Sequence, residues 1–187
     1  MNEQLLYCQM TPEEVIKLCN PNFDLIRKLI PVSGVRSTTD VFLVKETEQE
    51  YVLKIAEYNS THLETESKAL EILNYIDDRI THLINVYKNQ SKNLSCLQKE
   101  YEQGQFLQKW SDEDDYNHLK ETIGIMHNYG IAGVDVIPDN IVKSGKTGNP
   151  TIIDLSAVKF EKDWKNNPHQ FETYKRQDYS ELDLLFL

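Results

Sequence analysis

The stretch 123–160, IGIMHNYGIAGVDVIPDNIVKSGKTGNPTIIDLSAVKF, contains three polar residues, Asp135, Asn140 and Asp154, that lie in or beside apolar runs. Asp135 lies inside an apolar run, Asn140 follows it, and Asp154 ends a β-rich run further along. The turn-forming residues 144–150 predict a hairpin, which would place Asn140 and Asp154 at neighbouring strand ends. We therefore expect these two side chains to reach one metal ion, with Asp135 beside them in the preceding loop.

The composition is that of a small acidic globular protein. The chain has 187 residues, enough for one domain built as two small lobes, and 40% of them are hydrophobic. The formal net charge of -10 and the pI near 5.0 argue against nucleic acid or an anionic membrane as the main partner. No apolar run approaches the ~20 residues of a membrane span, and the first residues lack the features of a signal peptide.

The three cysteines, Cys8, Cys19 and Cys96, are odd in number and widely spaced. This pattern predicts separate buried thiols in a reducing compartment rather than a disulfide framework or a zinc site. We expect a protein that works in a cytosol.

The first part of the chain predicts a helical extension followed by a β-meander. Thr11 and Glu14 are spaced as a capping box around Pro12, so residues 1–24 are expected to contain one helix. Residues 25–55 then alternate strand-like runs with turns, and their polar tip contains Gly34, Ser37 and Thr38. Small residues at such a tip offer N–H and hydroxyl groups that suit an anion such as phosphate.

Lys54 lies among apolar neighbours in the last of these strands, and burying a lysine is costly unless an anion pairs with it. The helix expected over 60–76 supplies candidates. Thr61 and Glu64 have capping-box spacing, which gives Glu64 a structural task. Glu66 projects from the leucine face of the helix, so we choose Glu66 as the partner of Lys54, with Glu64 as the alternative.

A second strand pair is expected over 81–87 and 94–101, followed by the segment 100–104 and a helix over 116–129 that ends at Gly130. His127 near the end of this helix is expected to be a packed structural histidine.

Taken in order, these features resemble the protein kinase family. The strand around Lys54 is similar to the family's Val-Ala-Ile-Lys, and Asp135-x4-Asn140 followed by Asp154 is similar to its catalytic loop and Asp-Phe-Gly. The resemblance implies that Asp135 accepts or orients the proton of the attacking hydroxyl. It further implies that Asn140 and Asp154 hold Mg²⁺ on the ATP phosphates.

The same resemblance assigns the remaining nucleotide contacts. Lys54, oriented by Glu66, would contact the phosphates beneath the tip that holds Gly34, Ser37 and Thr38. The segment of Glu100 and Glu102 resembles the hinge whose backbone groups bind adenine.

The C-terminal part departs from the family pattern. Asp-Phe-Gly is replaced by Asp154-Leu155-Ser156, His-Arg before the catalytic aspartate by Gly133-Val134, and the lysine two residues after it by Ile137. A final helix is expected from about Gln177, with Asp178 as the family's buried aspartate that binds the catalytic loop backbone. The chain then stops.

We therefore expect an α+β fold of the protein kinase type: an antiparallel sheet with one main helix over 25–101, and a reduced helical lobe over 102–187. Short chains of this kind resemble the minimal effector kinases of bacterial pathogens, the OspG type and the chaperone-phosphorylating kinases. That resemblance implies a Ser/Thr protein kinase delivered into host cytosol, for example by type III secretion, as a virulence factor. Its implied partners are a host chaperone substrate and ubiquitin or a ubiquitin-conjugating enzyme.

Two alternatives stay open. One is a small-molecule or Bud32/RIO-type kinase, which shares the short segment after the metal-binding aspartate. The other is a pseudokinase that serves as a binding module.

Overall fold

The computed structural model describes residues 10–29, 39–74, 76, 79–106 and 112–187. The chain divides into two compact units, one built from residues 1–67 and 82–101, the other from residues 68–81 and 102–187. Each unit is described by itself below.

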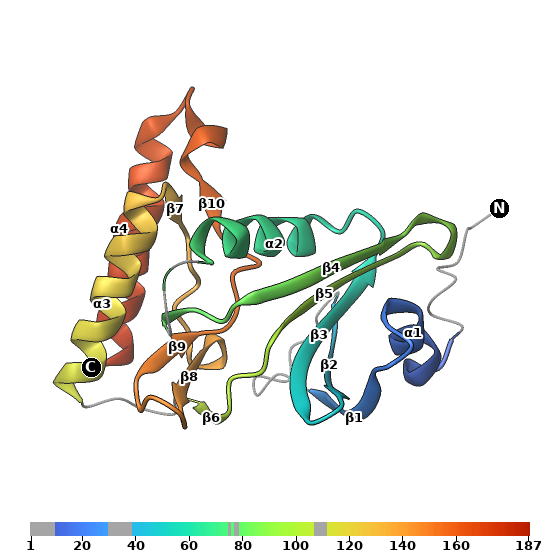
Figure 1. Ribbon diagram of the computed structural model, residues 1–187. Coiled ribbons are helices and arrows are strands. Elements are labelled where there is room, and N and C mark those ends of the chain that lie inside the picture. The colour runs from blue at the N-terminus through green and yellow to red at the C-terminus, as the bar shows by residue number, and fades with distance from the viewer. Residues whose placement is uncertain (1–9, 30–38, 75, 77–78, 107–111) are drawn as a thin grey trace. The chain divides into compact units, whose positions relative to one another are not determined.

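The first unit is organised by a five-stranded antiparallel sheet with the order β1-β2-β3-β5-β4 (Figure 1). Its strands are β1 (Asp24–Leu29), β2 (Asp40–Glu46), β3 (Gln49–Glu57), β4 (Leu83–Asn89) and β5 (Leu94–Glu100). The 3-10 turn η3 (Gln90–Lys92) connects β4 to β5. The expected β-meander and second strand pair are thus present.

Helix α1 (Pro12–Cys19) begins as the sequence predicts. Thr11 is its N-cap: Oγ1 of Thr11 accepts the N–H of Glu14, and the Glu14 carboxylate accepts the N–H of Thr11. The helix packs on the sheet face formed by alternate residues of β2, β3 and β5, because successive side chains of a strand point to opposite faces. The fully buried members of this core are Ile16, Phe23, Val44, Leu53, Ile55 and Cys96.

Two of the cysteines are joined in the structure. Cys19 of α1 and Cys96 of β5 form a disulfide in the core beneath α1. The expectation of separate thiols is therefore wrong for this pair, which lies 77 residues apart in sequence and is brought together by helix-on-sheet packing.

Helix α2 (Thr61–Leu73) follows β3 and contributes its first part to the first unit and its second part to the other. The helix includes Thr61, so the capping box expected at Thr61 and Glu64 is wrong: the N–H of Glu64 donates to the carbonyl of Ser60, and the Glu64 carboxylate binds Lys88 instead. Its buried residues include Leu63, Glu66, Leu70 and Leu73.

The second unit combines short strands with two long helices, α3 (Glu113–Asn128) and α4 (Pro168–Leu185). The pair β7 (Ile131–Ala132) and β10 (Lys159–Phe160) is antiparallel, as is the sheet of β6 (Gly104–Phe106), β8 (Ile141–Ser144) and β9 (Pro150–Ile152) in the order β6-β8-β9. The 3-10 turns η4 (Pro138–Asn140) and η5 (Glu161–Trp164) precede β8 and α4. The hairpin predicted around residues 144–150 is present as β8 and β9.

Helix α3 begins at Glu113, before the expected Tyr116, because Asp112 caps it: Oδ1 of Asp112 accepts the N–H of Asp114. Helix α4 begins at Pro168 and not near Gln177, so the prediction for its start is wrong. α3 and α4 lie side by side (Figure 1), joined by the hydrogen bond from the Tyr116 hydroxyl to Asp183 and by ring contacts of Tyr116 with Phe186.

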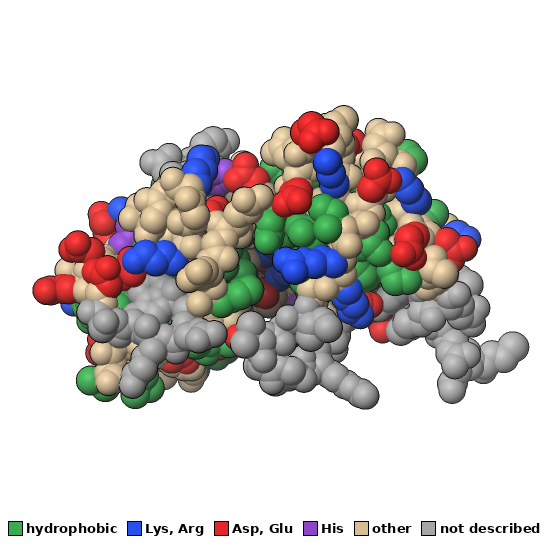
Figure 2. All heavy atoms as spheres, turned by 90° about the horizontal axis from the view of Figure 1, so that it is seen from below, with side chains coloured by type: hydrophobic (Ala, Val, Ile, Leu, Met, Phe, Trp, Pro, Cys, Tyr) green, Lys and Arg blue, Asp and Glu red, His purple; other side chains and the backbone are tan. Residues whose placement is uncertain are grey.

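The surface carries charges of both signs. Figure 2 shows Asp and Glu side chains interspersed with Lys, Arg and apolar groups over the described part of one face. Among the described residues, no helix is both long enough and apolar enough to cross a lipid bilayer.

Phe23 tests the core beneath α1, since its ring is fully buried and lies edge-on to Tyr87. We expect Phe23→Ala to lower the free energy of unfolding by about 3–5 kcal/mol, through lost burial and the cavity left behind. Leu18→Ala is the control, because Leu18 is exposed on α1 and its loss should cost less than about 0.5 kcal/mol. Urea denaturation measures both; equal losses would contradict the packing described.

Candidate active site

Lys54 and Glu66 form a buried ion pair within the first unit. Lys54 on β3 places its Nζ 2.6 Å from Oε2 of Glu66 on α2, and the two side chains are 7% and 0% exposed. The expected contact is therefore present, and Glu66 rather than Glu64 makes it. Glu64 pairs with Lys88 at the surface, with its Oε1 2.8 Å from Nζ.

A second lysine, Lys99, binds the other oxygen of the same carboxylate. Nζ of Lys99 lies 2.7 Å from Oε1 of Glu66, and the Lys99 side chain is 3% exposed. Lys99 is not among the site residues expected from the sequence. Strand register is the signal that would find it: Lys54 pairs with Leu97 across β3 and β5, so Lys99, two residues further, points to the same sheet face.

The segment 101–103 links β5 to β6. The N–H of Glu100 donates to the carbonyl of His82, and the carbonyl of Gln103 accepts the N–H of Gly145. Gly104 is required next, because a Cβ there would lie 2.1 Å from the carbonyl oxygen of Lys143 on the paired strand. The proposed backbone contacts of Glu100 and Glu102 with adenine stay predictions.

Three predicted phosphate-binding residues, Gly34, Ser37 and Thr38, lie outside the described residues. Their proposed role stays a prediction.

In the second unit, Asp135 and Asn140 are locked together by the turn between them. Asp135 has a φ of 55°, a left-handed conformation that aspartate tolerates better than most residues and that recurs at functional sites. Nδ2 of Asn140 donates to the backbone oxygen of Asp135 at 2.9 Å and to its Oδ2 at 3.1 Å. With both contacts made by the nitrogen, Oδ1 of Asn140 is the atom left to face a ligand.

Asp154 lies next to this turn in space, because the β8–β9 hairpin brings the two segments together. The N–H of Ile153 donates to the carbonyl of Asn140, and Ile152 pairs with Ile141 in the β8–β9 hairpin. These contacts bring Asp154 beside Asn140, as the hairpin prediction requires. Oδ1 of Asp154 accepts the N–H of Ser156, which sets the orientation of the carboxylate.

Nearby groups favour the protonated form of Asp135. Partial loss of hydration raises the pKa of the Asp135 carboxyl, the negative charges of Glu181 and Asp154 raise it further, and the Asn140 hydrogen bond opposes them. A carboxyl group poised in this way is suited to accept a proton.

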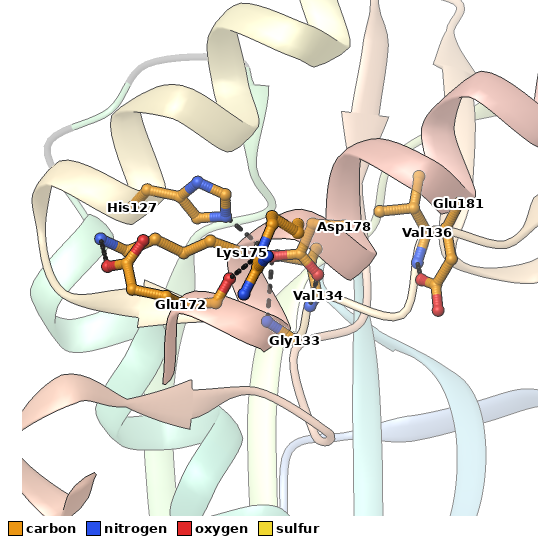
Figure 3. Close-up of polar contacts among 9 residues, drawn as sticks. His127, Gly133, Val134, Val136, Glu172, Lys175, Asp178 and Glu181 are labelled. Atoms are coloured by element: carbon orange, nitrogen blue, oxygen red, sulfur yellow. Dashed lines mark hydrogen bonds and ion pairs between the residues drawn. The ribbon is translucent and has the colours of Figure 1, made fainter. Parts of the chain in front are cut away.

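Asp178 binds the backbone of the loop that leads into Asp135 (Figure 3). This α4 residue has no exposed surface; its Oδ2 accepts the N–H of Gly133 at 3.0 Å and its Oδ1 accepts that of Val134 at 2.8 Å. Nε2 of His127 on α3 lies 2.8 Å from Oδ2, so His127 is a partner of the carboxylate as well as a packed side chain. Gly133 has a φ of 70°, which an L-residue with a Cβ rarely adopts.

Glu181 extends this support by one helical turn. Its Oε2 accepts the N–H of Val136 at 3.0 Å (Figure 3). Its Oε1 accepts a hydrogen bond from Nε2 of Gln177. Glu181 is not among the residues expected from the sequence, although its spacing of three residues from Asp178 places both on one face of a helix. α4 thus binds the backbone on both sides of Asp135.

The oxygen donors of Asn140 and Asp154 fit a Mg²⁺ ion that is bound together with nucleotide phosphates. Mg²⁺ commonly takes one or two protein oxygen ligands and completes its shell with phosphate and water. Among the described residues, no group of three or more His, Cys, Asp and Glu side chains forms a metal site of its own. A site of two donors matches a metal that arrives with its nucleotide.

Replacing Asp178 tests the support of the loop. Asp178→Asn sets an amide NH₂ against donors that need an acceptor, so we expect a loss of roughly 1–3 kcal/mol in unfolding free energy. Asp183→Asn on the same helix is the matched control, since it alters a single exposed hydrogen bond with Tyr116. Guanidinium denaturation of both variants measures the difference, and a control loss as large as that of Asp178→Asn would refute the role of Asp178.

No protein-family model matches the sequence, and comparison with curated proteins gives no match. Among solved structures, the chain is similar to the kinase PK-1 of Cydia pomonella granulovirus, with a TM-score of 0.62 and 17% sequence identity. The match covers 80% of this chain and 60% of the viral chain. Together with the antiparallel five-stranded sheet and the helical second unit, this likeness shows that the chain has a protein kinase-like α+β fold.

Proposed function

We propose that the chain is an ATP- and Mg²⁺-dependent protein kinase that transfers the γ-phosphate to serine or threonine. The observation that carries the proposal is the turn in which Asn140 binds Asp135 through its nitrogen while the backbone of Ile153 places Asp154 beside it. The turn of Asp135 and Asn140 and the neighbouring segment after β9 thereby bring together a proposed proton acceptor and two proposed oxygen ligands for a metal. The buried Lys54–Glu66 pair supplies the cation that phosphate recognition needs.

Each residue then has a role in phosphoryl transfer. Bound ATP supplies the phosphoryl group, and Mg²⁺ neutralises charge on its phosphates. Asn140 and Asp154 would hold the metal, Lys54 would contact the phosphates, and Asp135 would orient the acceptor hydroxyl and take its proton. Asp178 and Glu181 keep the loop of Asp135 in shape through backbone hydrogen bonds. In such reactions most of the catalysis comes from positioning and charge stabilisation.

The acceptor is proposed to be a protein. The resemblance of the motifs to minimal effector kinases supports a secreted bacterial effector that acts on a host protein such as a chaperone. The same resemblance supports ubiquitin or a ubiquitin-conjugating enzyme as an activating partner in the host cytosol. The structural neighbour, PK-1, is itself described as a kinase.

A pseudokinase is the second candidate, and the loop gives it a specific basis. Ile137 occupies the position two residues after Asp135 where kinases carry a lysine, and it is 38% exposed. The transferred phosphate would therefore lack one charge partner from the described part of this loop.

Transfer of label from γ-³²P-ATP with Mg²⁺ to proteins of a eukaryotic lysate tests the proposal. We expect labelled bands, or self-labelling, with the wild-type protein, and a fall of about 10²- to 10⁴-fold in Asp135→Asn because the positioned proton acceptor is lost. Asp154→Ala should abolish the signal together with the metal site.

Asp163→Asn is the matched control, because Asp163 is an exposed carboxylate of η5 with a long 4.0 Å contact to Lys68. It should label as the wild type does. Absence of label from every sample, with ATP binding retained in calorimetry, would favour the pseudokinase. Absence of ATP binding as well would refute the proposed kinase.

A further inference from the structure

The Glu66 carboxylate binds two lysines, Lys54 and Lys99, and not Lys54 alone. Nζ of Lys54 binds Oε2 at 2.6 Å and Nζ of Lys99 binds Oε1 at 2.7 Å. Both oxygens of the carboxylate are therefore engaged, each by a different strand. All three residues are less than one-tenth exposed.

Two hydrogen bonds fix a carboxylate more fully than one. With Lys54 alone, the Glu66 side chain could rotate about its terminal bonds and keep its contact, since the carboxylate torsion is broad. With Lys99 on the second oxygen, the plane of the carboxylate is set by β3 and β5 together. Because Glu66 belongs to α2, the same contact ties α2 to the centre of the sheet.

We propose that Lys99 is a positioning residue of the nucleotide site: by holding Oε1 of Glu66 it fixes α2 on the sheet and sets the orientation of Lys54 toward phosphate. The inference rests on the proposed function for the phosphate, and on the structure alone for the position of α2. Lys99 acts through Glu66 and is not itself a catalytic residue.

Loss of Lys99 is expected to affect the binding of phosphates and the binding of the nucleoside differently. If Lys99 acts through Lys54, its loss weakens ligands that carry phosphates and spares a ligand without them. A lysine with a purely structural role would weaken both ligands alike. ATP with Mg²⁺ and adenosine are therefore the probes, measured by calorimetry on the full chain.

The chain offers a matched control. Lys88 on β4 binds Glu64 on α2 at 2.8 Å, so it is also a lysine that joins the sheet to this helix, but its side chain is 43% exposed. Exposed ion pairs contribute little, because solvent screens them and both side chains lose entropy. Lys88→Met should leave affinity and helix dynamics unchanged.

We expect Lys99→Met to weaken ATP about ten- to hundredfold, the range for losing a charged hydrogen bond, and to leave adenosine within about twofold. Lys99→Arg should restore ATP affinity to within about threefold, since it can donate to the same oxygen. In a Glu66→Gln background, Lys99→Met should change ATP affinity by less than about twofold, because no carboxylate remains to be held.

Hydrogen exchange of residues 61–73 without nucleotide gives a second readout. The amides of α2 should exchange faster in Lys99→Met than in wild type or Lys88→Met. Unchanged exchange overturns the proposal whatever the affinities, and so does an equal loss of ATP and adenosine. If wild type binds neither ligand, the proposed function fails, while the exchange rates still decide whether Lys99 positions α2.

Discussion

The shape of the loop that carries Asp135 depends on one buried carboxylate, Asp178. A carboxylate without solvent is stable only when donors replace its lost water, and here the donors are His127 and the backbone of Gly133 and Val134. The hydrogen bonds that satisfy the carboxylate therefore also set the bend of the loop at Gly133 and Val134. The positive φ of Gly133 is the backbone geometry that accompanies these contacts. Asp135 follows these residues directly in the chain, so its backbone starts from the position that this contact sets.

The first unit also contains a buried carboxylate whose oxygens are bound by donors from other elements. There one carboxylate, Glu66, is surrounded by two ammonium groups from adjacent strands. Replacing one partner of a buried ionic cluster leaves an uncompensated charge, which usually costs more than the cluster gains over apolar packing. The three side chains meet only when β3 and β5 pair in their observed register and α2 places Glu66 over them.

The sequence predicts most parts of this structure that depend on neighbours in the chain, although the capping box expected at Thr61 and Glu64 is not formed. The capping residues of α1 and the turn between β8 and β9 are local, as is the choice of Glu66 from the face of its helix. Contacts that depend on packing escape it. Lys99 meets Glu66 across 33 residues, and Cys19 meets Cys96 only because α1 covers the sheet. The start of α4 at Pro168 escapes because its first turns carry mainly polar residues, so apolar periodicity begins late.

The hydrogen bonds of Asn140 have a consequence for how this chain tolerates change. Its nitrogen donates to two oxygens of Asp135, so the amide has a single workable orientation and the oxygen must point the other way. An aspartate has almost the same shape, yet at this position it would turn two attractive contacts into two repulsions between oxygens. Asn140→Asp, the substitution that changes the shape of this side chain least, is therefore among the least acceptable at this position.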